Sequence, residues 1–180
     1  MNAPWLLLKN LLFTLLVPGF VVWWVPLHWF ERYPRWPAPA AWGGPQYAAL
    51  ALAALAAALF LWCQGLFAVR GRGTPAPFDP PKKFIRRGPY KWVRNPMYLA
   101  VFALVAAETL FLRSWHIGVY LVLLACLVHV WVLVYEEEAL RRNFGAMYED
   151  YRREVPRWLP RRPRPTTTTV APFPPDSRER

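Results

Sequence analysis

Long uncharged stretches constrain the fold of this chain more than any other sequence feature. Three of them contain no charged side chain, at residues 10–30, 36–69 and 114–135. A shorter stretch, residues 96–112, is interrupted only by Glu108. A bilayer core of about 30 Å needs about 20 apolar residues in a helix. The sequence therefore predicts an all-α, polytopic membrane protein of about four transmembrane helices, at about 10–30, 47–69, 96–112 and 114–135.

Basic residues flank these stretches and indicate the topology. The formal net charge is +11, and the basic side chains concentrate in residues 70–94 and 141–164. The other two connections carry few charges. The positive-inside rule then places both termini and the 70–95 loop in the cytoplasm, with the chain in an inner or plasma membrane. Because topology already explains the basic residues, we expect no nucleic-acid partner.

The chain reads as a single domain over residues 1–164. A Pro- and Thr-rich tail follows at 165–180, and its composition predicts disorder. Pro18-Gly19 predicts a kink or break in the first helix. The third and fourth stretches are joined near Arg113–Trp115, so they should form an antiparallel helical hairpin. After the hairpin, Gly145 is a plausible helix C-cap, followed by a short amphipathic helix that Pro156 ends.

The sequence offers no recognisable metal site. Cys63 and Cys126 both lie inside apolar stretches, and the three histidines are scattered. Neither an HExxH nor a CxxC motif occurs, so no metal ligand set is predicted. A GxGxxG motif is missing as well, which excludes a soluble Rossmann-type cofactor site at the level of motifs.

Two polar segments could carry chemistry. The first, residues 88–98, mixes basic and aromatic side chains before the third stretch and could equally be a membrane anchor. The second is Glu136-Glu137-Glu138, at the predicted cytoplasmic end of the fourth helix. Negative charge is unfavourable at a helix C-terminus and beside an anionic leaflet. A solvated acidic helix end is the alternative to a functional site.

Local ion pairs should offset part of this cost. Helical spacing predicts that Glu137 pairs with Arg141, and Glu138 with the next arginine along the chain. Glu136 has no such partner, so it needs a cation from Arg94, from another loop residue or from a ligand. The hairpin returns the chain to the same side of the membrane. We therefore expect segments 88–98 and 136–156 to meet there.

The order and spacing of residues in these segments resemble the isoprenylcysteine carboxyl methyltransferase and phospholipid methyltransferase family of integral membrane enzymes. The matching residues are Gly88, Pro89, Tyr90, Arg94, Pro96 and Tyr98, then Glu136, Glu137, Leu140, Phe144, Gly145, Tyr148, Tyr151, Val155 and Pro156. The resemblance covers residues 80–160. One departure is Asn95, which stands where the family usually has histidine; asparagine can hydrogen-bond but cannot act as a base.

The resemblance implies S-adenosylmethionine (SAM) as the cofactor, bound beside the C-terminal hairpin on the cytoplasmic side. Glu136 and Glu137 would hold its ammonium group, and Arg94, Asn95 and backbone amides near Gly88 its carboxylate. Tyr90, Trp92 and Tyr98 would supply aromatic walls and cation–π contact. The cofactor-binding residues implied are Gly88, Pro89, Tyr90, Arg94, Asn95, Pro96, Tyr98, Glu136 and Glu137, with Arg94 and Asn95 as the catalytic pair.

The implied reaction is methyl transfer to a membrane-embedded or lipid-like acceptor. No strong general base lies near the motif, which favours an acceptor that is already ionised, such as a prenylcysteine-type carboxylate. The partners expected are a lipophilic small-molecule or lipidated acceptor and membrane lipids. Two alternatives remain open: an NADPH-dependent membrane reductase resembling sterol reductases, and a non-catalytic membrane scaffold.

Glu108 stands apart from both segments, near the opposite end of the third stretch. An intramembrane acid is a functional candidate by default. Snorkelling to the interface or pairing with Arg113 is the simpler interpretation, and we favour it.

Overall fold

Helices account for all the regular structure in the computed structural model, which describes residues 18–30, 36–67 and 84–161. The main helices are α2 (Gly44–Leu66), α3 (Pro96–Leu112), α4 (Trp115–Trp131), α5 (Glu137–Phe144) and α6 (Ala146–Glu154). Shorter helical turns occupy Phe20–Trp24, Pro26–Phe30, Pro39–Ala41, Gly88–Lys91 and Val132–Glu136. The described residues contain no strand, and the predicted all-α class is confirmed. The predicted tail at 165–180 lies outside the described residues.

Helix α2 begins three residues before the predicted span, because its first turn is specified by polar contacts. The Gln46 side chain accepts a hydrogen bond from the Gly43 backbone N–H at 3.0 Å. Pro45 occupies the first turn, where a missing N–H costs nothing. Gln46 also donates to the Phe111 carbonyl at 3.4 Å, so it links the start of α2 to the end of α3. Residues 68 and 69 of the predicted span are outside the described part.

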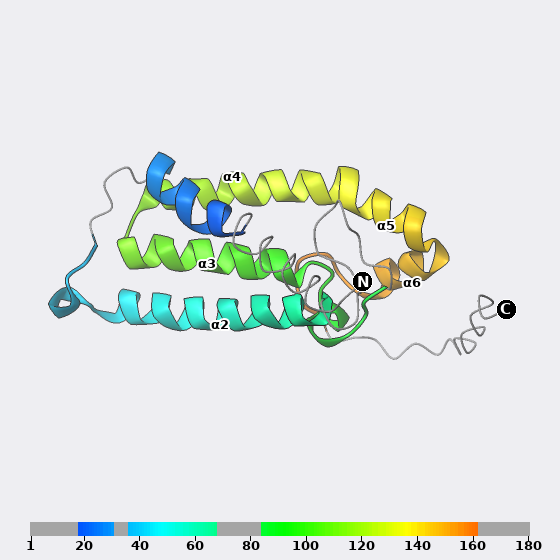
Figure 1. The fold of residues 1–180 in the computed structure, drawn as a ribbon, viewed down its shortest axis with the longest axis horizontal. Coiled ribbons are helices and arrows are strands. Elements are labelled where there is room, and N and C mark those ends of the chain that lie inside the picture. Colours follow the sequence, from blue (N-terminus) through cyan, green and yellow to red (C-terminus); the bar gives the residue numbers. More distant parts are fainter. Residues whose placement is uncertain (1–17, 31–35, 68–83, 162–180) are drawn as a thin grey trace, which may run out of the picture.

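Helices α3 and α4 form the predicted antiparallel hairpin. Pro96 begins α3, and Arg113 ends it in the left-handed region at φ 53°. Ser114 then caps α4, its side chain accepting from the Ile117 N–H at 3.5 Å. Figure 1 shows α2, α3 and α4 lying side by side, with α3 in the middle. This arrangement returns the end of α4 to the level of the start of α3.

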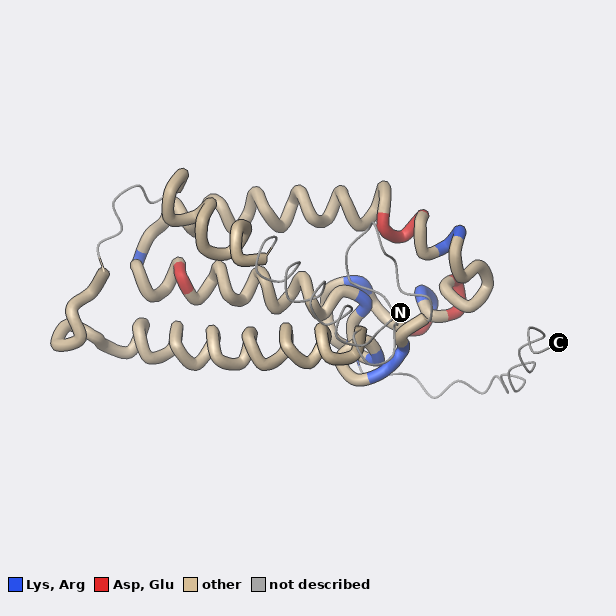
Figure 2. The backbone as a smooth tube through the Cα atoms, in the orientation of Figure 1, with Lys and Arg blue, Asp and Glu red and all other residues tan. Residues whose placement is uncertain are grey.

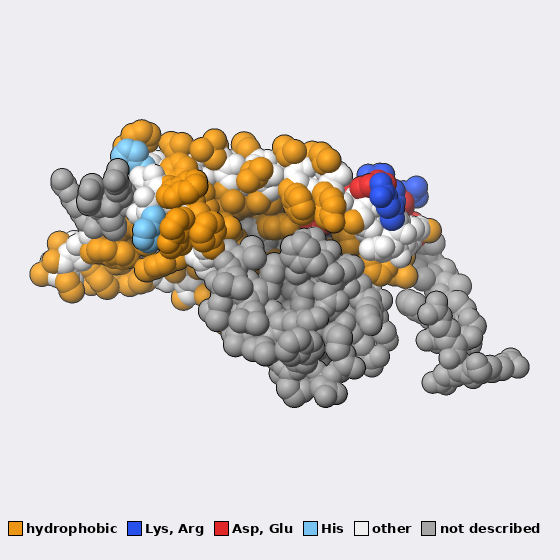
Figure 3. Space-filling model, turned by 45° about the horizontal axis from the view of Figure 1, so that its top comes forward, with side chains coloured by type: hydrophobic (Ala, Val, Ile, Leu, Met, Phe, Trp, Pro, Cys, Tyr) orange, Lys and Arg blue, Asp and Glu red, His pale blue; other side chains and the backbone are white. Residues whose placement is uncertain are grey.

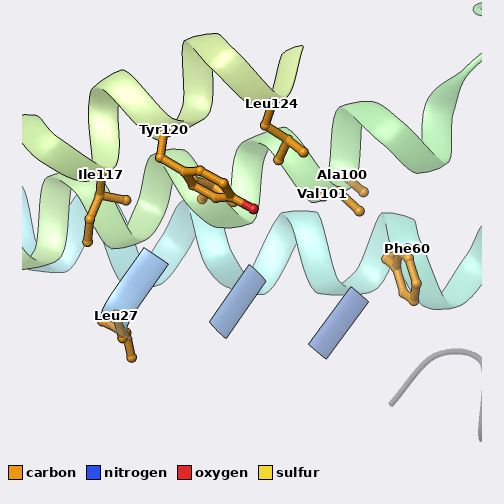
Figure 4. Close-up of a cluster of buried hydrophobic side chains, with 8 residues drawn as sticks. Leu27, Phe60, Ala100, Val101, Ile117, Tyr120 and Leu124 are labelled. Carbon is orange, nitrogen blue, oxygen red and sulfur yellow. The ribbon is translucent and has the colours of Figure 1, made fainter. Parts of the chain in front are cut away.

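The core lies between the hairpin, α2 and the described part of the first helix. Its buried residues are Leu27, Phe60, Ala100, Val101, Val105, Ile117, Tyr120 and Leu124, all but Val105 labelled in Figure 4. Ala100 is fully buried, and small residues at such positions let helix backbones approach closely. The Tyr120 hydroxyl donates to the Val21 carbonyl at 2.7 Å, which ties the first helix to α4. The predicted break at Pro18-Gly19 falls at the edge of the described residues.

Apolar side chains also cover the outside of the bundle. Two of the described helices, α2 and the continuous helix from Trp115 to Phe144, are long and apolar enough to cross a membrane. In the most apolar 18-residue stretch of each helix, only 28% and 22%, respectively, is buried inside the protein. Figure 3 shows apolar side chains along the bundle and charged ones at one end. Such a surface fits a lipid environment. Of the four predicted spans, two are long and apolar enough in the described residues to cross a membrane.

Beyond α4 the helix runs on through a wide turn at Val132–Glu136 into α5. Gly145 ends α5 at φ 50°, as its predicted capping role requires. Helix α6 then packs Tyr148 and Tyr151 inward beside Val155, the residue that follows it, while Met147 is exposed. Figure 2 shows charged residues gathered at this end of the molecule, around α5 and α6.

Candidate functional site

The wide helical turn at Val132–Glu136 directs two neighbouring acids, Glu136 and Glu137, toward the start of α3. The Glu137 N–H donates to the carbonyl of Val132, five residues earlier, which is the bond of a π turn. In a regular α-helix, residues five apart point about 140° away from each other. The π turn narrows the angle between the side chains of Val132 and Glu137, so that both can face the protein interior. Both residues are buried. Single-turn π segments of this kind occur frequently at functional sites.

Glu137 is the centre of a buried charge cluster. Its carboxylate accepts a hydrogen bond from Arg94 Nη1 at 3.0 Å and from Arg157 Nε at 2.6 Å. Arg157 Nη2 reaches the second oxygen at 3.1 Å, so this pair is bidentate. The side chain of Glu137 is 8% exposed and that of Arg94 is 10% exposed. Both carboxylate oxygens are therefore committed to arginines.

Glu136 has a different environment. Its Oε2 accepts a hydrogen bond from the Tyr98 hydroxyl at 2.8 Å. Within the described residues this is the single hydrogen bond to the Glu136 side chain, and no ion pair reaches it. The predicted cation from Arg94 does not reach Glu136, because Arg94 pairs with the neighbouring acid; within the described residues a phenol of segment 88–98 is the partner instead.

Residues 155–161, here called the C-terminal strap, run back across the start of α3. Three hydrogen bonds hold the strap there: Arg94 N–H to Pro156 O at 2.9 Å, Asn95 Nδ2 to Arg157 O at 3.3 Å, and Arg161 N–H to Trp92 O at 3.1 Å. The strap positions the Arg157 guanidinium against Glu137. Asn95 therefore serves the strap through its side-chain amide, a contact that needs only a donor.

Trp158 anchors the strap between the two helices of the hairpin. Its indole N–H donates to Nδ1 of His129 on α4 at 2.9 Å. Its ring lies beside those of Tyr98 and Phe102 on α3, with centroid separations of 6.5 and 5.9 Å. His129 is thus engaged by the strap, and it does not line the cavity described next.

Helix α6 closes the opposite wall. The Tyr151 hydroxyl donates to the Tyr90 carbonyl at 2.7 Å, and the Tyr148 hydroxyl accepts from Arg94 at 3.3 Å. Burial raises the pKa of Tyr90, Tyr148 and Tyr151, with the negative charge of Glu137 also raising that of Tyr148. These phenols therefore stay protonated at neutral pH. The hydrogen bond to Glu137 raises the pKa of Arg157, which stays charged.

These elements enclose a cavity of about 340 Å³. Its polar lining includes Arg94, Asn95, Glu136 and Glu137, and most of the remaining lining is aromatic or aliphatic. A volume above about 300 Å³ with few, converging polar groups is typical of small-molecule sites. The aromatic lining consists of Phe67, Phe84, Tyr90, Tyr98, Trp131, Tyr135, Phe144, Tyr148 and Tyr151.

The predicted site residues divide into two groups. Those that line the cavity are Tyr90, Arg94, Asn95, Tyr98, Glu136 and Glu137. Gly88, Pro89 and Pro96 do not line it, and they shape the backbone instead. Gly88 has φ +56°, and a Cβ there would lie 3.1 Å from Leu66 and 3.3 Å from Trp62. The two prolines are buried at the beginnings of a 3-10 turn and of α3.

Two local expectations were wrong. Trp92 is exposed and lines no part of the cavity; it contributes its backbone carbonyl to the strap. Arg141 pairs with Glu138 and Glu149 and not with Glu137, because the arginines of the loop and the strap take Glu137. The predicted pair of Glu138 with Arg142 does form.

Sequence reasoning missed Arg157 as part of the site. Its only sequence signal is its position directly after Val155-Pro156, at the end of the recognised pattern. Tyr148 and Tyr151 were noted in that pattern without a role, although both line the cavity. Trp131 and Tyr135 were read as ordinary apolar residues of the fourth span.

The fold and the site together define a helical membrane protein with a charged, aromatic-lined cavity at one end of its hairpin. The family profile described as phospholipid methyltransferase matches residues 45–147, more than half of the chain. The chain therefore belongs to the phospholipid methyltransferase family, whose members are methyltransferases. No curated protein and no solved structure matches the chain significantly. The matched range includes every predicted site residue, whereas Arg157 lies beyond it.

Proposed function

We propose that this protein is a SAM-dependent methyltransferase that acts on a lipophilic acceptor in the membrane. The observation that carries the proposal is the cluster of Arg94, Glu137 and Arg157 beside Glu136 in an aromatic-lined cavity. It lies at the end of the bundle where the charged residues gather and within a chain of the methyltransferase family.

The donor and acceptor set of the cavity fits the amino acid end of SAM. Glu136 keeps capacity to accept the ammonium group, because only Tyr98 hydrogen-bonds to it among the described residues. Arg94 Nε is buried without a hydrogen-bond partner there, so it can donate to a carboxylate. Glu137 then holds the two guanidinium groups in place and does not itself contact the cofactor.

Aromatic side chains would hold the rest of the cofactor. Tyr90, Tyr98 and Tyr135 line the cavity, and their π faces attract a sulfonium cation. When bound, SAM supplies an electrophilic methyl group. The chain's own contribution is alignment and exclusion of water, since displacement at a methyl carbon depends mainly on positioning.

The acceptor proposed is a carboxylate on a lipophilic molecule, such as a prenylcysteine-type group. No histidine lines the cavity, and its tyrosines in the loop and in α6 stay protonated. A carboxylate needs no base, whereas an ammonium acceptor would have to lose a proton to Glu136. The acceptor would come from the bilayer past Trp131 and Tyr135, which are exposed, stacked at 4.5 Å and part of the cavity wall.

We further propose that residues 10–30 and α3 complete four spans and that both termini face the cytoplasm. Helix α3 has 17 residues, or about 25 Å at 1.5 Å per residue, which is short for a bilayer and suits a helix packed between two others. The charged end around α5 and α6 would then face the cytoplasm.

Calorimetry with S-adenosylhomocysteine on the detergent-purified protein tests the proposal. We expect saturable binding that Glu137→Gln weakens more than tenfold, because both arginines lose their anchor, and that Glu138→Gln leaves unchanged. Folded protein that binds no S-adenosylhomocysteine would contradict the proposal. NADPH binding in its place would favour the reductase, and binding of neither ligand would favour a scaffold.

A further inference from the structure

A second cavity of about 310 Å³ lies toward the other end of α3. It is bounded by α2, α3 and the described part of the first helix, through residues such as Ala53, Leu104, Trp23 and Leu27. Its described lining is almost wholly apolar, and among the described residues Glu108 is the one charged side chain in it. Glu108 is ten residues from Tyr98 on the same helix, about 15 Å along the axis, so the two cavities are separate.

Within the described part of the chain, Glu108 has no hydrogen-bond or ion-pair partner. Its Oε2 is buried and makes no hydrogen bond to the described residues. The expected pair with Arg113 is wrong: Arg113 is exposed and no ion pair joins the two. Tyr120, on the facing helix, donates its hydroxyl to the Val21 carbonyl and is committed there. Burying an acid in apolar surroundings without a hydrogen-bond partner costs free energy. We therefore look for a partner of Glu108 beyond the described residues.

We propose that this second cavity binds a lipophilic primary amine from the bilayer, its ammonium group on Glu108 and its alkyl chain in the apolar cavity. The described lining offers one carboxyl group and otherwise hydrocarbon, and these two features are complementary to a single-chain alkylammonium. An alkylammonium is protonated at pH 7, as lysine is. It would both neutralise the carboxylate and fill its unused hydrogen-bonding capacity. This site is independent of the proposed methyl transfer.

The test compares dodecylamine with dodecanol, which has the same chain and no charge. Radiolabelled ligands are titrated into phosphatidylcholine nanodiscs that hold the full chain, and empty discs give the membrane partition to subtract. We expect dodecylamine to bind at least tenfold tighter than dodecanol, because hydrogen bonds to charged groups are the strong ones. Equal affinity for the two ligands would overturn the proposal.

Variants separate the charge from the cavity. Glu108→Gln should lose the preference for the amine and keep the affinity for dodecanol, because glutamine preserves the shape. Asp150→Asn removes an exposed acid at the opposite end of the molecule and should change neither affinity. Ala53→Phe should fill the cavity and weaken both ligands, with thermal unfolding confirming that the variant folds. An amine preference that survives Glu108→Gln, or binding unaffected by Ala53→Phe, would refute the assignment.

Discussion

Replacing Glu137 with glutamine should destabilise the protein far more than the same change one residue later. Glu137 neutralises Arg94 and Arg157, whose side chains are 10% and 26% exposed. Glutamine keeps one acceptor oxygen but leaves two guanidinium groups without an anion. Breaking a buried ion pair costs about 3–5 kcal/mol. Because Arg157 is partly open to solvent, we expect about 3 kcal/mol in the free energy of unfolding.

The adjacent acid is a matched control. Glu138 pairs with Arg141 and Arg142, and its side chain is 40% exposed. Exposed pairs contribute about 0–1 kcal/mol. In a chain of this size, about 3 kcal/mol corresponds to a fall in Tm of about 6–12 °C. Glu138→Gln should lower Tm by about 3 °C or less.

Thermal unfolding of the two variants in the same detergent, followed by circular dichroism, measures this difference. The double variant Glu137→Gln with Arg157→Gln should recover part of the loss, because one of the orphaned cations is removed with its partner. Equal shifts in Tm for Glu137→Gln and Glu138→Gln would refute the reasoning. So would additive effects of the Glu137 and Arg157 changes.

Three further changes test the surroundings of the site. Tyr98→Phe removes the 2.8 Å hydrogen bond to Glu136 and should cost about 1.5–3 kcal/mol in unfolding free energy, whereas the exposed Tyr47→Phe should cost little. Gly88→Ala should lower Tm, because φ at Gly88 is +56° and the added Cβ would meet Leu66 at 3.1 Å. Gly65 lies within α2 with open space around it, so Gly65→Ala should raise the free energy of unfolding by about 0.5–1 kcal/mol. Asn95→His should preserve the affinity for S-adenosylhomocysteine in calorimetry, because an imidazole N–H can also donate to the strap. Asn95→Ala removes the donor and should weaken that affinity. An equal loss of affinity in both variants would show that the amide itself is required.

Much of the fold could be predicted because local signals decide it. Pro96 and the Arg113-Ser114 turn mark the ends of α3, and the observed bounds agree with the expected ones. The hairpin brings Arg94 and the acids of α5 together, as predicted from the order of the spans. Gly145 ends its helix where a glycine at positive φ permits it.

The pairing inside the site could not be predicted from helical spacing. Helical spacing assigned Glu137 to Arg141, and residues 137–144 do form a regular helix, but the arginines of the loop and the strap take Glu137 instead. The π turn at Val132–Glu136 changes the angle between the apolar span and the acids, and nothing local in its sequence signals it. Arg157 escaped notice for another reason. Its approach depends on the reversal at Gly145 and on the path of the strap, which are tertiary features.

The most direct test of the central claim is transfer of labelled methyl groups. The purified protein in nanodiscs is incubated with methyl-labelled SAM and a total membrane lipid extract, and the organic phase is counted and separated. We predict a labelled lipophilic product, base-labile as a methyl ester is, whose formation falls more than tenfold in Glu137→Gln and is unchanged in Glu138→Gln. No labelled product from the folded wild-type protein, or equal labelling by the Glu137→Gln variant, would contradict the account.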